Sequence, residues 1–390
     1  MANNNKHTGP NVPALRFPEF SGEWTKIKLG DLGNFFSGGT PSSSRKDFYG
    51  GEIPFIRSGE LHSDSTALSI TKEAYDSCSA KMVNKGDLLL ALYGATSGDI
   101  SISRISGAIN QAILCIRPQY MDAYFIKSLW EKHKKHILET YLQGGQGNLS
   151  SEIIKNISFF FPNNDEQVKI SRLIHIIDDR IETQTKIIEE LTTLRSALLE
   201  KVFQVSNPTL EVGAIVHQTS ERNKLCRYSN VLSVSNRFGF INQSEQFEDR
   251  NVASDDVRNY KVVHRGDFAY NPARINVGSI AMLKTFESGI VSPMYICFQV
   301  DDTIVDPSFF ELFLETKAFK DEMEIRLEGS VRRCLSFEAL CEIHLPRPAL
   351  LVQRSISDKI GNISSKIKLE DRILRAYIRQ KEWLLKQMFI

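Results

Sequence analysis

The stretch QVKISRLIHIIDDRIETQTKIIEELTTLRSALLEKVF, residues 167–203, returns near the end of the chain as QRSISDKIGNISSKIKLEDRILRAYIRQKEWLLKQMF, residues 353–389. Adding 186 to a position in the first copy gives its counterpart in the second without a gap, so that Ile174 becomes Ile360. Apolar residues recur in both copies at intervals of three and four, the spacing of an amphipathic helix. The sequence therefore predicts two copies of one long helix, and with them two similar modules about a pseudo-twofold axis.

The two helices carry matching seams of apolar residues at heptad spacing, which predicts that each seeks a partner helix. Polar residues interrupt both seams at the same places: Gln184 and Arg195 in the first copy, Glu370 and Lys381 in the second. A parallel pair would oppose Arg195 to Lys381, whereas an antiparallel pair opposes Arg195 to Glu370 and Gln184 to Lys381. Because like charges on a seam are unfavourable, we predict an antiparallel coiled coil held by these four residues. Packing of each helix on its own module is the alternative.

Short strand and turn signals precede each long helix. Lys85-Gly86-Asp87 is a turn signal that leads into an apolar run, and Arg265-Gly266-Asp267 repeats it 180 positions later. We expect strands at 88–93 and 108–116 and a helix at 122–142 in the first module. The fold class is thus α+β, with two α/β domains joined by two long antiparallel coiled-coil helices. The expected segments are an N-terminal tail (1–20), a first domain (21–162), a central helix (163–205), a second domain (206–347) and a C-terminal helix (348–390).

Composition limits the classes of protein that fit. The chain has 390 residues, of which 42% are hydrophobic, so it can form real cores. A net charge of +1 gives no global case for nucleic-acid binding, so such a function must rest on local patches. The six cysteines form no CxxC pair and no apolar run is long enough for a membrane span, so we expect reduced thiols, a cytoplasmic location and no membrane partner.

No motif for catalysis is complete. The loop Asn271-Pro272-Ala273-Arg274 is similar to the Asn-Pro-Pro-aromatic loop of adenine methyltransferases, but it lacks the second proline and the aromatic residue that would stack on a flipped base. There is no GxxxxGK[ST] phosphate loop and no glycine-rich cofactor fingerprint after a strand. His133 and His136 stand among lysines that would repel a metal ion, which favours a helix surface over a metal site.

Several segments together resemble the specificity subunit of a type I restriction–modification system. The opening Leu15-Arg16-Phe17-Pro18-Glu19-Phe20 and the repeated turn-strand beginning at Lys85-Gly86-Asp87 are similar to segments of that family. So are residues 271–280 with 289–295, and the helix openings Asp165-Glu166-Gln167 and Val352-Gln353-Arg354, of which the second lacks the glutamate. The resemblance covers nearly the whole chain, and the order of these motifs is its most specific feature.

This resemblance implies two target recognition domains, each reading half of a bipartite DNA site, on helices that space the domains and dock partner subunits. The chain would then be a non-catalytic subunit that directs adenine methylation and restriction. Its partners would be double-stranded DNA, two methyltransferase subunits and motor-nuclease subunits. S-adenosylmethionine, ATP and Mg²⁺ would bind those partners, with no cofactor in this chain.

Candidate DNA contacts are polar residues on loops that can reach base edges or phosphates. In the first domain these are Arg57, Ser58, Tyr93, Thr96, Ser97, Gln143, Gln146 and Asn148. In the second domain they are Asn271, Arg274, Asn276, Arg332 and Arg333. The two sets differ in chemistry, which predicts two different half-sites and an asymmetric target. For each residue the alternative is an ordinary surface position. For the whole chain the alternatives are a self-contained modification enzyme and a coiled-coil DNA-binding or protein-scaffold module without a role in modification.

Overall fold

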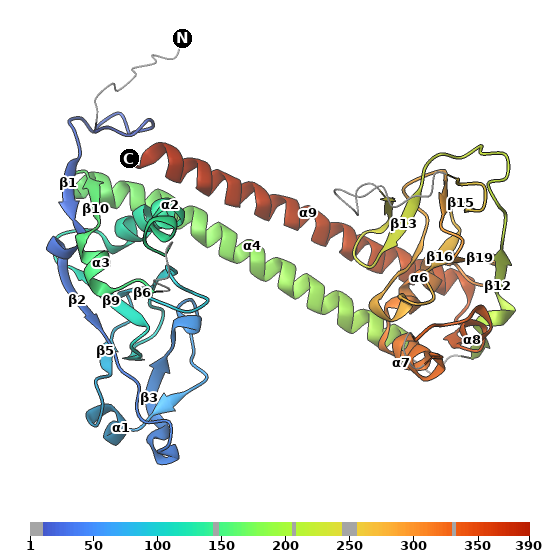
Figure 1. Ribbon diagram of the computed structural model, residues 1–390, viewed down its shortest axis with the longest axis horizontal. Coiled ribbons are helices and arrows are strands. Elements are labelled where there is room, and N and C mark those ends of the chain that lie inside the picture. Colours follow the sequence, from blue (N-terminus) through green and yellow to red (C-terminus); the bar gives the residue numbers. More distant parts are fainter. Residues whose placement is uncertain (1–10, 143–147, 205–207, 244–255, 330–332) are drawn as a thin grey trace, which may run out of the picture. The chain divides into compact units, whose positions relative to one another are not determined.

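The computed structural model describes residues 11–142, 148–204, 208–243, 256–329 and 333–390 (Figure 1). They form two compact units. Unit 1 holds the chain up to Lys186 together with Arg372–Ile390, and unit 2 holds Ile187–Asp371. Two long helices, α4 (Asn164–Gln204) and α9 (Leu350–Met388), each contribute one part to each unit. The predicted repeat of a long helix is therefore confirmed.

Apart from these helices, the elements of unit 1 follow in this order: β1 (Thr25–Lys28), β2 (Gly33–Ser37), β3 (Tyr49–Ile56), η3 (Ser58–Glu60), β4 (Ser69–Ile70), α1 (Lys72–Asp76), β5 (Lys81–Val83), β6 (Leu88–Ala91), β7 (Ile100–Ile102), β8 (Gly107–Ile109), β9 (Ile113–Pro118), α2 (Ala123–Leu142), α3 (Ser151–Asn156) and β10 (Ser158–Phe161).

The elements of unit 2 are β11 (Thr209–Glu211), β12 (Val216–Thr219), β13 (Leu232–Ser235), β14 (Gly239–Asn242), β15 (Lys261–His264), β16 (Phe268–Tyr270), η5 (Ile275–Val277), β17 (Ile280–Met282), β18 (Ser288–Val291), β19 (Ile296–Val300), α6 (Pro307–Glu315), α7 (Lys317–Arg326), α8 (Phe337–Cys341) and β20 (His344–Pro346).

Both units are built on the same sheet topology. Unit 1 has an antiparallel sheet in the order β2-β9-β6-β7, and unit 2 repeats it as β12-β19-β16-β17. The pair β1-β10 likewise corresponds to β11-β20. Unit 1 has a further sheet, β4-β3-β8-β5, in which β3 and β8 run parallel, whereas unit 2 has the separate pairs β13-β14 and β15-β18 at this place. The fold class predicted from the repeat is confirmed, and the units differ most in this second sheet.

In each unit one helix connects the sheet to the long helices. In unit 1, α2 lies beside α4 (Figure 1). It buries Phe125 and Trp130 against the sheet and bonds to α4 through Asp178, which accepts from Tyr124 and Lys127. In unit 2, Phe310 of α6 packs edge-on against Phe268 of the sheet. The neighbouring Phe309 stacks on Phe203 of α4, with ring centroids 4.8 Å apart. The core of each unit therefore includes one end of a long helix.

Within each unit the long helices run antiparallel, as predicted. In unit 1, Asp178 of α4 pairs with Lys381 of α9 at 2.8 Å, while Arg180, further along α4, lies over the ring of Tyr377, earlier in α9. In unit 2, the side chain of Arg195 donates to Ser364 at 2.7 Å.

The predicted polar partners on the helices, however, were wrong. Arg195 was expected to meet Glu370, but it bonds to Ser364 and pairs with Glu315 of α6 at 2.8 Å. Lys381 was expected to meet Gln184, but it pairs with Asp178 and with Glu131 of α2 at 2.7 Å. The seam pattern opposes only helix to helix, whereas Glu131 of α2 and Glu315 of α6 supply further partners for the two cations. Gln184 and Glu370 are both buried.

A single strand was expected over 108–116, but the chain breaks there into β8 and β9, which belong to different sheets. Asn110 makes the break, because its side chain accepts from the backbone N–H of Ala112 and its carbonyl accepts from that of Ile113. Asparagine commonly forms such turns by bonding to its own backbone two residues on. The break leaves Gln111 exposed in a loop.

The N-terminal segment was expected to be a tail, but residues 11–20 pack on the long helices of unit 1. The backbone N–H of Leu15 donates to the carbonyl of Gln387 near the end of α9. Arg16 makes a two-pronged ion pair with Glu166 at the start of α4, with both contacts at 2.7 Å and the side chains only 2% and 0% exposed. Residues 1–10 lie outside the described residues.

Candidate nucleic-acid interface

Three loops of unit 1 meet at one edge of the sheet, where β6 ends. The backbone N–H of Leu92 donates to the carbonyl of Ala112, and that of Leu149 donates to the carbonyl of Leu92, both at 2.8 Å. These bonds join the loops 92–99, 110–112 and 148–150, which we call the loop edge of unit 1. The end of β3 reaches the same place, because the carbonyl of Ile56 accepts from Asn110.

The loop edge of unit 1 presents uncharged polar side chains. Thr40 donates a hydrogen bond to the side-chain oxygen of Gln111, and Tyr93 is also hydrogen bonded to Gln111. Burial raises the pKa of Tyr93, and its hydrogen bond with Gln111 offsets part of that effect, so the phenol is neutral near pH 7. Thr40 and Gln111 are exposed, so hydroxyl and amide groups of this cluster face solvent.

Thr40 and Gln111 are not among the residues predicted from the sequence. A signal for the second was present, because Asn110-Gln111 interrupts an apolar run that otherwise extends from Ala108 to Ile116. No comparable signal marks Thr40, which reaches the cluster only through the fold.

The residues predicted for unit 1 lie in and beside this edge. Thr96 and Ser97 are in the loop after β6, where the hydroxyl of Ser97 bonds back to the carbonyl of Leu92 and stabilises the turn. Asn148 is exposed beside Leu149. Ser58 opens η3, directly after Arg57. Gln143 and Gln146 lie outside the described residues.

Arg57 is already engaged within the chain. Its guanidinium pairs with Glu60 at 3.1 Å, and its backbone N–H donates to the same carboxylate. The ion pair with Glu60 raises the pKa of Arg57, so the residue stays cationic. To bind a phosphate or a base, Arg57 must share or leave this partner.

Unit 2 forms the same edge from the corresponding loops. The backbone N–H of Leu335 donates to the carbonyl of Pro272 at 3.1 Å, which repeats the bond between Leu149 and Leu92. The side chain of Asn271 caps the loop by accepting from Ala273, and its amide lies 3.7 Å from the sulfur of Met294. The loops 271–279, 292–295 and 333–335 therefore form the loop edge of unit 2.

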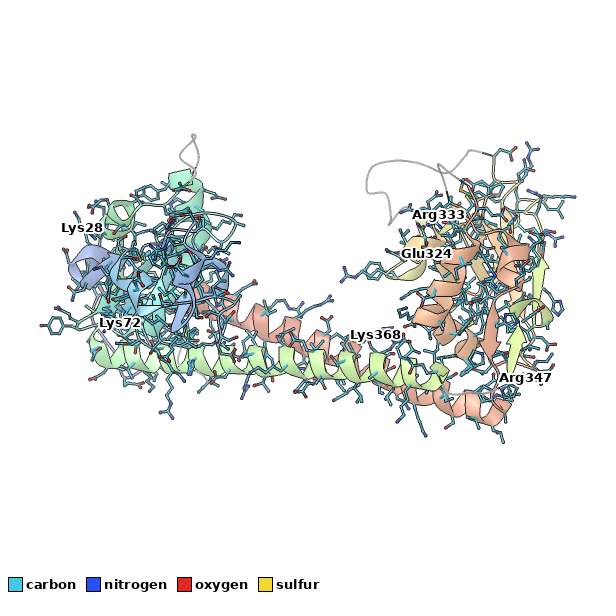
Figure 2. The ribbon with its side chains drawn as sticks, turned by 90° about the horizontal axis from the view of Figure 1, so that it is seen from below. Lys28, Lys72, Glu324, Arg333, Arg347 and Lys368 are labelled. Atoms are coloured by element: carbon cyan, nitrogen blue, oxygen red, sulfur yellow. The ribbon has the colours of Figure 1, made fainter. Side chains whose placement is uncertain are left out.

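The predicted residues of unit 2 divide into exposed and engaged ones. Arg274 and Asn276 are exposed on the loop after β16, which closes at Gly278 with a φ of +88°, a conformation that favours glycine. Arg333 instead pairs with Glu324 of α7 at 3.0 Å, and Figure 2 shows the two side chains next to each other. Both are about half exposed, so this pair is a weak surface interaction that a phosphate can replace. Arg332 lies outside the described residues.

The described residues contain no group of three or more His, Cys, Asp or Glu side chains placed to hold a metal ion. Burial raises the pKa of the Cys115 and Cys297 thiols to about 12, so both are neutral side chains of the core. His133, considered above as a metal ligand, lies instead against the carbonyl of Ile390 at 2.9 Å. Among the described helices, none is both long enough and apolar enough to cross a membrane.

Comparison with known proteins gives a consistent family. A model described as the type I restriction modification DNA specificity domain matches residues 21–193. The specificity subunit of type I restriction enzyme MjaVIII from Methanocaldococcus jannaschii is 24% identical over 391 residues, covering 91% of this chain and 89% of that protein. The MjaIX specificity subunit from the same organism is 28% identical over 192 residues, which cover 46% of this chain and only 44% of that protein.

Solved structures share the fold. The S subunit of a type I restriction–modification system from M. genitalium superposes with a TM-score of 0.63 at 15% identity, covering 97% of this chain and 99% of that one. A chain from a structure on complex assembly and conformational transition of the type I system gives 0.51 at 13% identity, covering 94% and 97%. The domain match, the curated relatives and the shared architecture agree: residues 21–193 match the type I restriction modification DNA specificity domain, and nearly the whole chain is similar to a specificity subunit of a type I restriction enzyme.

Proposed function

We propose that this chain is the specificity subunit of a type I restriction–modification system and recognises an asymmetric, bipartite DNA target, with one half read at the loop edge of each unit. The observation that carries the proposal is that both units join two corresponding loops of this edge through the same backbone bond, Leu149 to Leu92 and Leu335 to Pro272. The side chains they present nevertheless differ: threonine, tyrosine and glutamine in unit 1, but asparagine, arginine and methionine in unit 2. Direct readout of bases depends on such side chains, so a shared scaffold with different chemistry favours two different half-sites.

We further infer that the chain itself performs no catalysis. It directs adenine methylation by two methyltransferase subunits and restriction by motor-nuclease subunits, which bind S-adenosylmethionine, ATP and Mg²⁺. The support is that its relatives are named as specificity subunits. The methyltransferase-like loop at Asn271 also has another use, since the Asn271 side chain caps its own turn and contacts Met294.

The deciding experiment is methylation sequencing of host DNA with and without this gene, while the methyltransferase subunit is expressed. The expected result is that a split motif with methyladenine in each half, and with different sequences in the two halves, disappears when the gene is deleted. An unchanged methylome would overturn the proposal and favour a coiled-coil scaffold that binds only proteins. A palindromic motif that disappears would keep the role in modification but contradict the asymmetric target.

A further inference from the structure

Unit 2 has a hairpin, β13–β14, with no counterpart among the described residues of unit 1, and its tip carries an exposed aromatic residue. Strands β13 and β14 pair from Leu232 with Asn242 to Ser235 with Gly239, leaving a three-residue tip, Asn236-Arg237-Phe238. The tip closes on Gly239 at a φ of +66°, and the hydroxyl of Ser235 accepts from the backbone of Arg237 and Phe238. Three-residue hairpin loops that end on a left-handed glycine are a common and well-defined turn. The tip therefore has a defined conformation that is part of the fold.

Contacts with two neighbouring loops place this tip at the loop edge of unit 2. A Cβ added to Gly278 would lie 3.3 Å from the Cβ of Asn236, so the tip borders the loop after β16. Just below the tip, the carbonyl of Val234 accepts from the hydroxyl of Ser279 at 2.9 Å. The backbone N–H of Val234 also lies 3.3 Å from the phenol of Tyr295, in the loop before β19.

The side chains at this edge are unusually apolar for a surface. Phe238, Val277 and Met294 are 66%, 51% and 62% exposed. Exposed apolar residues are usually scattered singly over a protein surface, whereas these three belong to the loops of one edge. Two cations border them: the guanidinium of Arg237 lies over the Phe238 ring at 5.2 Å, and Arg274 is exposed on the adjoining loop. An apolar surface edged by arginines suits a ligand that has both anionic groups and flat apolar faces.

We propose that Phe238 inserts into the DNA half-site read by unit 2 as an apolar wedge between stacked bases, with Arg237 bound to the flanking phosphate. This inference rests on the proposed function and adds a contact that reads the deformability of DNA. Proteins that insert apolar side chains between base steps unstack them locally and favour flexible pyrimidine–purine steps. An aromatic ring gains stacking contacts with the bases, and the arginine already beside it gains a phosphate partner.

The wedge would act on one half of the target only. In unit 1, β3 occupies the place of β13, since Phe55 pairs in parallel with Ala108 as Val231 does with Ile290. The chain then enters η3, whose Ser58-Gly59-Glu60 carries no large apolar side chain. The two half-sites would thus be recognised by different physical means, which a comparison of the two halves can detect.

The test uses the full chain with its methyltransferase subunit and duplexes carrying the target found by methylation sequencing, with 2-aminopurine at successive positions of either half. Outside the methylated adenines, which a methyltransferase flips out of the stack, we expect the unaltered protein to raise fluorescence at one step in one half, because 2-aminopurine brightens when it is unstacked. Phe238→Ala should abolish that rise and weaken binding by about tenfold, within the range measured for removal of a base-stacking aromatic. Phe238→Trp should retain both.

Tyr120→Ala is the matched control, because Tyr120 is 81% exposed and lies beyond the far end of β9 from the loop edge of unit 1. It should leave both readouts unchanged. If the unaltered protein bound no DNA, the proposed function itself would fail. If it bound but Phe238→Ala neither weakened binding nor changed the fluorescence, the wedge would be refuted while the proposed function stood.

Discussion

Asp178 on α4 is the centre of a polar network in unit 1. Its carboxylate accepts from Lys127 at 2.9 Å and Lys381 at 2.8 Å, and from the phenol of Tyr124. Glu131 shares both lysines. Burial by itself raises the pKa of Asp178, but the attraction of the lysines and the hydrogen bonds outweigh burial, so the pKa lies below its ordinary value of 3.8. The charged form of Asp178 therefore stabilises the folded state.

We predict that Asp178→Asn lowers the free energy of unfolding of unit 1 by about 2–3 kcal/mol at pH 7, because it leaves two lysines short of a partner near helix interfaces. A group whose pKa is depressed on folding stabilises the fold above its unfolded pKa, and this contribution is lost as the pH falls through the folded pKa. The difference between the two proteins should therefore be largest at neutral pH and shrink below pH 3.8. Urea unfolding followed by tryptophan fluorescence measures it, since all three tryptophans, Trp24, Trp130 and Trp383, belong to unit 1.

Asp47 provides the control for this prediction. Its pKa is also lowered, by hydrogen bonds from Arg45, but both side chains are at least half exposed, so solvent screens their interaction. Asp47→Asn should leave the urea midpoint almost unchanged. Equal effects of the two substitutions at pH 7 would show that the buried network is not what stabilises this helix interface.

At the residue scale, the sequence indicated which polar residues matter on the long helices but not their partners. The sequence correctly placed Arg195 and Lys381 among the residues that face the other long helix. The repeat also extends to the side chains around these two residues. Lys381 contacts Asp178 and Glu131, and the equivalent Arg195 contacts Ser364 and Glu315. Two of these partners, Glu131 and Glu315, stand on α2 and α6, and no heptad pattern shows which face of those helices meets α4 or α9. A comparison of two helices cannot reveal partners that a third helix supplies.

At the element scale, the joint between each globular domain and its long helix is repeated bond for bond. The side chain of Gln167 on α4 accepts from the backbone of Asp122 and donates to the carbonyl of Pro162. Gln353 on α9 makes the same pair of bonds, accepting from Asp306 and donating to the carbonyl of Pro348. Both glutamines are essentially fully buried.

The aspartates complete this joint. Asp122 caps α2 by accepting from Phe125 and also accepts from the hydroxyl of Ser171 on α4. Asp306 caps α6 and accepts from the hydroxyl of Ser357 on α9 in the same way. One side chain thus starts the domain helix and ties it to the long helix, so each joint sets the position of the domain helix on the long helix within its unit.

We predict that Gln167→Ala loosens unit 1 alone and that Gln353→Ala loosens unit 2 alone. Each substitution leaves a buried backbone N–H and carbonyl without their partner, which costs about 1–3 kcal/mol per group. Hydrogen exchange should show faster exchange at the start of α2 in the first variant and at the start of α6 in the second. Gln380→Ala, at an exposed position of α9, is the control and should change neither. Loss of protection in both units from either single substitution would contradict independent joints.

The sequence predicted helices and strands best where a single periodic or apolar pattern continues over many residues. The two amphipathic helices and the apolar strand β6 follow directly from periodicity and run length. The strand expected over 108–116 failed because its composition is apolar throughout, while a single asparagine turn at Asn110 divides it between two sheets. The sequence predicts a tail at the N-terminus because nothing local shows that Arg16 pairs with Glu166, 150 residues away. Local sequence patterns do not encode contacts between residues that are far apart in the chain.

At the scale of the whole molecule, the duplication was readable because one offset aligns both long helices, and a duplicated fold predicts two similar domains. The composition of the two loop edges was only partly readable. Loops after β6 and β16 could be matched by their flanking turns, but Thr40 and Gln111 join the edge through tertiary contacts. The hairpin tip at Phe238 has no counterpart to align with, since the two units differ in their second sheet.

The proposal that each unit reads one half-site leads to a prediction for the whole chain. If each unit reads one half-site, Gln111→Ala should relax base preference in one half of the target only, and Arg274→Ala in the other half only. Loss of a direct base contact costs about 1–3 kcal/mol of discrimination at the contacted position, and the number of base pairs between the halves should stay the same. Selection of bound sequences from a library randomised in both halves measures this directly, with Gln380→Ala as the control. A variant that instead weakens binding to all sequences, with a smaller dependence of affinity on salt, has lost a phosphate contact. Relaxation of the same half by both variants would contradict the proposal, because two loop edges in separate units would then serve one half-site.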